Sequence, residues 1–231
     1  MIVASANDLP EAPAPAPALR TVSLAGPAGR LEAVVNEGAA EARYAALVCH
    51  PHPLGGGNLH NRVVYHAMKA LNAPEWGLAL PVLRFNFRGT GLSQGAHDGE
   101  AEAADVEAAL EWLRRAYGLP MVAAGFSFGA AMALKACCGQ TDVRALALLG
   151  LPTQAAGSQF EYPLLGQCTI PKLFLSGDCD TFAPEAQLAE VAAAAAEPKR
   201  LVLLPRADHF FTGHLERMQV ELSGWLKERL T

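Results

Sequence analysis

A serine between two glycines is the first feature of this sequence that could do chemistry. Ser127 lies in the stretch GFSFGA, after an apolar run and before a run of helix-forming residues. A nucleophile on a strand-to-helix turn needs small neighbours because strand and helix crowd it, and Gly125, Gly129 and Ala130 meet that need. The start of the helix also directs its free N–H groups at the serine. The pattern predicts a nucleophilic serine rather than an incidental tight turn.

A serine hydroxyl is a weak nucleophile at neutral pH, so it needs a base to accept its proton and a carboxylate to orient that base. His209, in RADHFF, is alone among the seven histidines in lying directly after a late predicted strand. Asp178 and Asp180 follow another strand, KLFLSG. Asp178 could cap its own turn, which would leave Asp180 to reach the imidazole. The chain order of serine, acid and histidine fits a site built on one parallel sheet.

Acyl transfer also needs N–H donors for the oxyanion that forms when a carbonyl is attacked, commonly two of them. The backbone N–H of Phe128, directly after the serine, is one candidate. The loop CHPHPLGGGN should supply the other. Pro51 and Pro53 have no N–H to give. His52 lies between them and is the first candidate, with Leu54 as the alternative.

A different interpretation of the same loop is a metal site. His50 and His52 form an HxH pair, a spacing that can bind a metal ion. The Pro-Leu-Gly that follows adds no further ligand, and a metal would leave the serine motif without a role. We therefore expect neither a metal nor a cofactor.

Eight short apolar runs alternate with helical patterns, and these elements must bring the candidate residues together. We expect strands at residues 20–25, 30–35, 44–50, 80–87, 121–125, 144–150, 172–177 and 200–205. We expect helices at residues 58–72, 99–117, 127–138, 184–196 and 213–229, with Asn58 and Asp98 as candidate N-caps. The first two strands follow each other across a short GPAG turn and should be antiparallel, whereas helices separate the later ones, which should be parallel. Such a sheet collects the candidate residues at the carboxyl ends of its strands.

The domain organisation follows from composition along the chain. Residues 1–19 include the alternating PEAPAPAPA and should form a flexible, extended tail that cannot build a core. Residues 20–231 should then form a single α/β domain, a size that one hydrophobic core can support. The connection at residues 151–170 is too short for a separate lid domain.

Charge and hydropathy limit the partners. The net charge of −5 gives no basic field for nucleic acid or anionic lipid. No leader-like segment opens the sequence and no apolar run is long enough for a membrane span, so we expect a cytoplasmic protein. The five cysteines lie mostly in apolar runs and should be reduced and buried; we interpret Cys137 and Cys138 as core residues rather than a redox pair. A homodimer is compatible with these features.

Five motifs in order, HPHP, FNFRGTGLSQG, GFSFG, GDCDTFAP and DHFF, resemble those of the α/β-hydrolase superfamily, specifically its small lidless bacterial members that are esterase-like or related to dienelactone hydrolases. The resemblance extends from about Leu31 to the end of the chain. The family's GxxDxxxP pattern falls on Asp180 and Pro184, and HPHP matches its HGxP loop with proline in place of glycine. The elbow has Ser127 where dienelactone hydrolases proper have cysteine.

The resemblance implies an α/β-hydrolase fold and a serine hydrolase that cleaves carboxylic esters through an acyl-enzyme, without a cofactor. Because the connection between the sixth and seventh strands is short, we expect an open cleft that takes small, short-chain acyl esters. A peptidase, thioesterase or lactone hydrolase with the same residues is the alternative, and a non-catalytic interaction module is another. Arg88 should be structural and paired with a carboxylate. Aromatic and apolar residues near the motifs are candidate walls of an acyl pocket: Leu54, Phe126, Phe128, Phe210 and Phe211.

Overall fold

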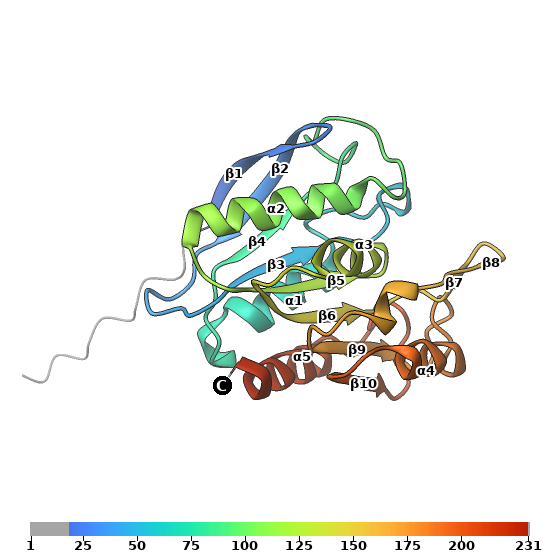
Figure 1. Cartoon of the computed structure of the whole chain (residues 1–231). Coiled ribbons are helices and arrows are strands. Elements are labelled where there is room, and N and C mark those ends of the chain that lie inside the picture. The colour runs from blue at the N-terminus through green and yellow to red at the C-terminus, as the bar shows by residue number, and fades with distance from the viewer. Residues whose placement is uncertain (1–18, 231) are drawn as a thin grey trace, which may run out of the picture.

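All eight expected strands form, and they join into one sheet in the order β1-β2-β4-β3-β5-β6-β9-β10 (Figure 1). In the computed structural model, which describes residues 19–230, their bounds are β1 Leu19–Gly26, β2 Gly29–Asn36, β3 Ala45–Cys49, β4 Val82–Phe85, β5 Met121–Phe126, β6 Val143–Leu149, β9 Lys172–Gly177 and β10 Lys199–Leu204. Strand β2 is antiparallel to β1 and β4, and the other neighbours are parallel, which confirms a mostly parallel sheet.

Most of the segment expected as a tail, residues 1–18, lies outside the described residues. Leu19, the last residue assigned to that tail, is instead the first residue of β1 and pairs with Asn36 of β2. The strand therefore begins one residue before the expected domain boundary.

Five α-helices within residues 19–230 cover the two faces of the sheet. They are α1 Arg62–Asn72, α2 Glu102–Tyr117, α3 Phe128–Cys137, α4 Glu185–Ala194 and α5 Leu215–Leu230. Side chains of α2, α3 and α4 pack into the core on one face, and those of α1 and α5 into the core on the other. Successive residues of β3 supply both cores in alternation, as the two-residue period of a strand requires: Leu47 faces the first, Val48 the second. Within residues 19–230, no helix is long and apolar enough to cross a membrane.

Both expected N-caps are wrong. Asn61, not Asn58, caps α1: its side chain accepts hydrogen bonds from the N–H groups of Val63 and Val64. Asn58 instead accepts from the N–H of His60 in the turn before the helix. The two asparagines are three residues apart and equally suited to capping, so composition alone did not separate them.

Asp98 is not a helix N-cap either, because α2 begins four residues after it. Its Oδ1 accepts from the N–H groups of Glu100 and Ala101, so it stabilises the turn that leads into the helix. Ala101 is the N-cap residue and offers no side-chain bond. The expected helix was therefore too long at its start.

The connection between β6 and β9 contains a small hairpin that the sequence analysis missed. Strands β7, Gln154–Ala155, and β8, Ser158–Gln159, pair antiparallel. Their two turn residues, Ala156 and Gly157, both have positive φ, which is the geometry of a tight type I′ turn. Ala-Gly carries a weaker turn signal than Asn-Gly, and two-residue strands show no alternation. The hairpin is far too small to be a lid domain.

The cysteines are all free thiols, but their burial varies. Cys137 lies in the core, as expected. Cys138, the next residue, is only half-buried, and Cys179 is exposed because it lies in the turn after β9. The expectation of buried thiols is therefore wrong for Cys179.

Arg88 anchors the loop after β4 to helix α2. Its guanidinium donates from Nη2 to Oδ1 of Asp105 at 2.7 Å and from Nε to Oδ2 at 3.0 Å, and its backbone N–H donates to the same carboxylate. Both residues are buried. The expectation that Arg88 is structural and paired with a carboxylate is confirmed.

We expect Asp105→Ala to lower the free energy of unfolding by about 3–5 kcal/mol, because it leaves the buried guanidinium of Arg88 unpaired. Chemical denaturation followed by circular dichroism measures this. The exposed pair of Arg217 and Glu221 on α5 is the matched control, and Glu221→Ala should lower stability by less than about 0.5 kcal/mol. Equal losses in the two variants would contradict the structural role of Arg88.

Candidate active site

Ser127 lies at the junction of β5 and α3 in a strained backbone conformation. Its φ is 55° and its ψ is −120°, a region that residues with side chains rarely occupy. A Cβ on Gly125 would lie 2.2 Å from the carbonyl oxygen of Gly129, and a Cβ on Gly129 would lie 2.4 Å from that of His50. Only glycine fits at either position, so the crowding inferred from the sequence is present.

His209 and Asp180 approach Ser127 from two other strand ends. The Oγ of Ser127 lies 3.0 Å from Nε2 of His209, and Nδ1 of His209 lies 2.8 Å from Oδ2 of Asp180. The loops after β5, β9 and β10 thus bring together three residues that are 29 to 82 positions apart in the chain. This arrangement orients the imidazole so that Nε2 can take the serine proton.

Asp180 is buried, and every bond it makes favours its charged form. Besides His209, its Oδ2 accepts from the hydroxyl of Ser176, while Oδ1 accepts from the N–H groups of Phe182 and Ala183. Burial raises the pKa of Asp180, but the hydrogen bond and charge interaction with His209, together with the bonds from Ser176 and Phe182, hold that pKa below its ordinary value. The carboxylate is fixed in position and ready to stabilise a protonated imidazole.

Asp178 does not contact the imidazole, and it does not cap its own turn as the sequence allowed. Its Oδ1 accepts from the backbone N–H of Arg206 at 2.7 Å, which ties the turn after β9 to the turn after β10. It is exposed and makes no contact with His209 among the described hydrogen bonds. The two carboxylates therefore have different partners, and Asp180 is the one that binds the imidazole of His209.

The two expected oxyanion donors, Phe128 and His52, lie beside each other. Their rings are 5.1 Å apart, and both residues line one cavity with Ser127. No backbone hydrogen bond among residues 19–230 uses the N–H of either residue. Leu54, the alternative donor, is 80% exposed and lines a different cavity, to which Ser127 does not contribute. The positions therefore favour His52 over Leu54.

His50 is a structural residue, not half of a metal site. Its Nδ1 lies 2.6 Å from the carbonyl oxygen of Pro51, and its Nε2 accepts the N–H of Phe87 at 3.0 Å. Both ring nitrogens are thus occupied, and burial lowers the pKa of His50 to about 4. In the part of the chain that the structure describes, no group of three metal-ligating side chains comes together. The HxH interpretation is not supported by this geometry.

A cavity of about 470 Å³ opens beside Ser127, within the size range of ligand pockets. Of the five residues expected to wall it, only Phe128 does. Phe126 and Phe211 are buried in the core beneath α5, because Phe126 is one residue away from Ser127 on β5 and points to the opposite face. Phe210 packs on the ring of His209. Residues that the sequence analysis missed line the cavity instead, among them Ala131, Met132, Pro152, Phe160, Tyr162 and Phe182.

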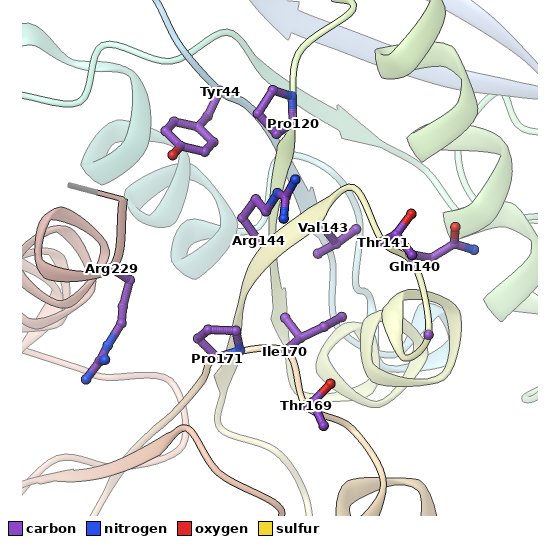
Figure 2. A pocket seen from close by; sticks show the side chains of 11 residues that line it. Tyr44, Pro120, Gln140, Thr141, Val143, Arg144, Thr169, Ile170, Pro171 and Arg229 are labelled. Carbon is purple, nitrogen blue, oxygen red and sulfur yellow. The ribbon is translucent and has the colours of Figure 1, made fainter.

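A second cavity, of about 680 Å³, lies at the opposite edge of the sheet, near the starts of β3, β5, β6 and β9 (Figure 2). Tyr44, Pro120 and Pro171 are among its walls, and Arg144 and Arg229 are its charged residues. None of the residues gathered around Ser127 contributes to it. The candidate active site is therefore the smaller cavity, at the carboxyl ends of the strands, where open α/β sheets bind ligands.

The chain belongs to the α/β hydrolase domain family, whose match covers residues 45–226. An uncharacterized protein of Rickettsia prowazekii is 31% identical over 209 residues, which are 87% of this chain and 86% of that protein. Among solved structures, an α/β serine hydrolase homologue from Coxiella burnetii is 34% identical with a TM-score of 0.80, covering 90% of this chain and 97% of that one. A lidless α/β serine hydrolase from Xanthomonas campestris is 28% identical with a TM-score of 0.76, covering 91% and 94%.

The low pKa of His50 predicts a loss of stability in mild acid. Because the folded pKa is about 4 and the ordinary value is 6.5, the unfolded chain binds the proton more readily between these pH values. The contribution of neutral His50 is complete above pH 6.5 and is lost as the pH falls toward 4, a total of about 3 kcal/mol. NMR titration of the ring, assigned by its absence in His50→Asn, tests the cause. Protonation of His50 near pH 6.5 would refute it.

Proposed function

We propose that this protein is a serine hydrolase that cleaves carboxylic esters through an acyl-enzyme intermediate, with Ser127, His209 and Asp180 as its catalytic triad. The observation that carries the proposal is the continuous hydrogen-bonded chain from hydroxyl to imidazole to carboxylate, with contacts of 3.0 and 2.8 Å. Membership in the α/β hydrolase family and likeness to serine hydrolases support it.

In the first half of the reaction, the Oγ of Ser127 attacks the ester carbonyl while Nε2 of His209 accepts the hydroxyl proton. The carbonyl oxygen becomes an oxyanion that accepts hydrogen bonds from the backbone N–H groups of Phe128 and His52. As the tetrahedral intermediate collapses, the bond to the alcohol oxygen breaks, and protonated His209 gives its proton to that oxygen. Asp180 stabilises the imidazolium throughout.

In the second half, a water molecule replaces the alcohol. His209 takes a proton from this water, the resulting oxygen nucleophile attacks the acyl carbonyl, and the oxyanion forms again at the same two N–H groups. Collapse breaks the bond to Ser127 Oγ, which regains its proton from His209. The carboxylic acid leaves and the starting state is restored.

The positions of the donors give the oxyanion site its rigidity. The start of α3 packs directly on the end of β3, because Gly129 has no side chain to hold them apart. His52 lies between two prolines that restrict the loop, and its ring is held against those of Phe128 and His97. Donors fixed before the substrate arrives stabilise charge more effectively than donors that must reorganise.

The substrates that suit this site are small and soluble. The connection from β6 to β9 forms only a short hairpin and a single-turn helix, so the cleft has no lid domain to bind emulsified lipid. Thioesters, lactones and peptides would react through the same acyl-enzyme, and a substrate panel at matched concentrations separates these classes.

Ser127→Ala should lower kcat for p-nitrophenyl butyrate by about 10⁴-fold or more, because the acyl-enzyme can no longer form. Asp180→Asn should lower it by about 10³- to 10⁴-fold through loss of the correct imidazole orientation. The matched control is Asp178→Asn, two residues away on the same turn, which should retain activity within about threefold. Equal losses at positions 178 and 180, or full activity in Ser127→Ala, would contradict the proposed triad.

A further inference from the structure

One face of α3 forms the floor of the cavity beside Ser127. Phe128, Ala131, Met132 and Lys135 all line it, at the i, i+3, i+4, i+7 spacing that places residues on one side of a helix. These residues start next to the nucleophile and run away from it along the helix axis. A rise of about 1.5 Å per residue gives the cavity a length of about 10 Å from the serine.

The opposite wall comes from the segment that contains the β7–β8 hairpin. Pro152, Phe160 and Tyr162 line the cavity, and internal bonds hold them in place. The hydroxyl of Tyr162 donates to the carbonyl oxygen of Pro152 at 2.6 Å, and the N–H of Phe160 donates to that of Thr153 at 2.8 Å. Thr153 in turn donates its N–H to the carbonyl oxygen of Phe182, another wall residue. The floor and this wall together make an apolar groove.

The far end of the groove is polar. Lys135 lies there with its Nζ 3.8 Å from the carboxylate of Glu100, and both side chains are exposed. Glu161 also lines the cavity, so its charged lining residues are one lysine and two glutamates, which leaves it slightly negative. An anionic group would gain no net electrostatic attraction from these charges. An uncharged chain can end here without burying a charge, because this end of the groove is open to solvent. The groove thus favours a neutral apolar group that ends near Lys135.

The position of His209 decides which half of an ester enters this groove. His209 must protonate the leaving alcohol oxygen, so the alcohol lies on its side of Ser127. His209 does not line the groove, whereas Phe128 and His52, the proposed oxyanion donors, do. The acyl carbon, whose oxygen faces those donors, therefore directs its chain along α3.

We propose that this groove is the acyl-binding subsite and that it selects linear, uncharged acyl chains of about six to eight carbon atoms, which fill its length of about 10 Å. Ala131 sets the depth of the groove from the floor, and Phe160 covers the chain from the opposite wall. The inference rests on the proposed ester hydrolysis and adds the substrate class and the residues that choose it. Longer chains extend past Lys135 into water and gain nothing more.

The test is kcat/KM for p-nitrophenyl esters with acyl chains of 2, 4, 6, 8 and 12 carbons. In the unmodified protein, each added methylene should raise kcat/KM by about fourfold until the groove is full near eight carbons. A second series keeps the acetyl group and lengthens the alcohol, and its kcat/KM should vary by less than about threefold. A gain with alcohol length instead of acyl length would overturn the assignment of the groove.

Ala131→Phe should block the groove halfway along. Its kcat/KM for the octanoate ester should fall by about tenfold or more, while that for the acetate ester stays within about threefold. Ala193→Phe, which adds the same ring at an exposed position of α4, is the matched control and should behave as the unmodified protein does. Parallel losses on acetate and octanoate in Ala131→Phe would overturn the inference.

Phe160→Ala provides a second variant that leaves the core intact, since this ring is 40% exposed. It should lower kcat/KM for octanoate by about fivefold and leave acetate hydrolysis unchanged. These measurements distinguish a wrong assignment of the groove from a wrong proposed function. If the unmodified protein hydrolyses acetate but shows no dependence on acyl length, the groove assignment is wrong; if it hydrolyses no ester at all, the proposed function is wrong.

Discussion

The close packing of α3 on the end of β3 is the constraint on which the site depends. A Cβ at Gly129 would overlap the carbonyl oxygens of Cys49 and His50, so the helix and the strand can meet only because this residue has no side chain. This contact lies directly beside Ser127, whose backbone has a positive φ of 55° at the top of the turn. It also brings the first N–H of the helix alongside the loop that contains His52. This one contact at Gly129 thus helps to position both Ser127 and the two N–H groups that are proposed to bind the oxyanion.

The rest of the site is built to keep the imidazole of His209 still. Asp180 is held by Ser176 and by two backbone N–H groups, so it cannot turn away when it binds Nδ1. The ring itself lies among Phe126, Phe182 and Phe210, with centroid distances of 4.6 to 5.2 Å. Gly150 leaves room beneath it, since a Cβ there would lie 3.2 Å from the ring. Packing and hydrogen bonds therefore restrict the ring to the orientation that faces Ser127.

Much of this could be predicted from the sequence because it depends on local patterns. Buried strands are short runs of apolar residues, and their alternation with helices fixes a parallel sheet and its carboxyl edge. Ser127, Asp180 and His209 each follow such a strand, so the edge brings them together. The glycines of the GFSFG motif, Gly125 and Gly129, could be interpreted from the sequence because a strand-to-helix turn is crowded and leaves no room for a side chain at those positions.

The predictions from sequence were wrong or incomplete where a residue's position depends on contacts between distant segments of the chain. The direction of Phe126 depends on which residue of β5 faces which helix layer, and a motif that merely places it beside the serine does not reveal this. The walls at Pro152, Phe160 and Tyr162 depend on a two-residue hairpin with no periodicity. The cap of α1 depends on which of two asparagines the preceding turn presents to the helix, and that turn is tied to the loop after β4 by a hydrogen bond from the N–H of Leu59 to Oδ1 of Asn86.

If Ser127 is an activated nucleophile, an electrophile that reacts with activated serines should modify it. The folded protein is treated with a fluorophosphonate, its intact mass is measured, and the modified peptide is sequenced. We expect one adduct per chain, on Ser127, and much slower formation of this adduct when His209 is replaced by glutamine. A folded protein that takes up no adduct, or carries it at another residue, would show that Ser127 is not activated.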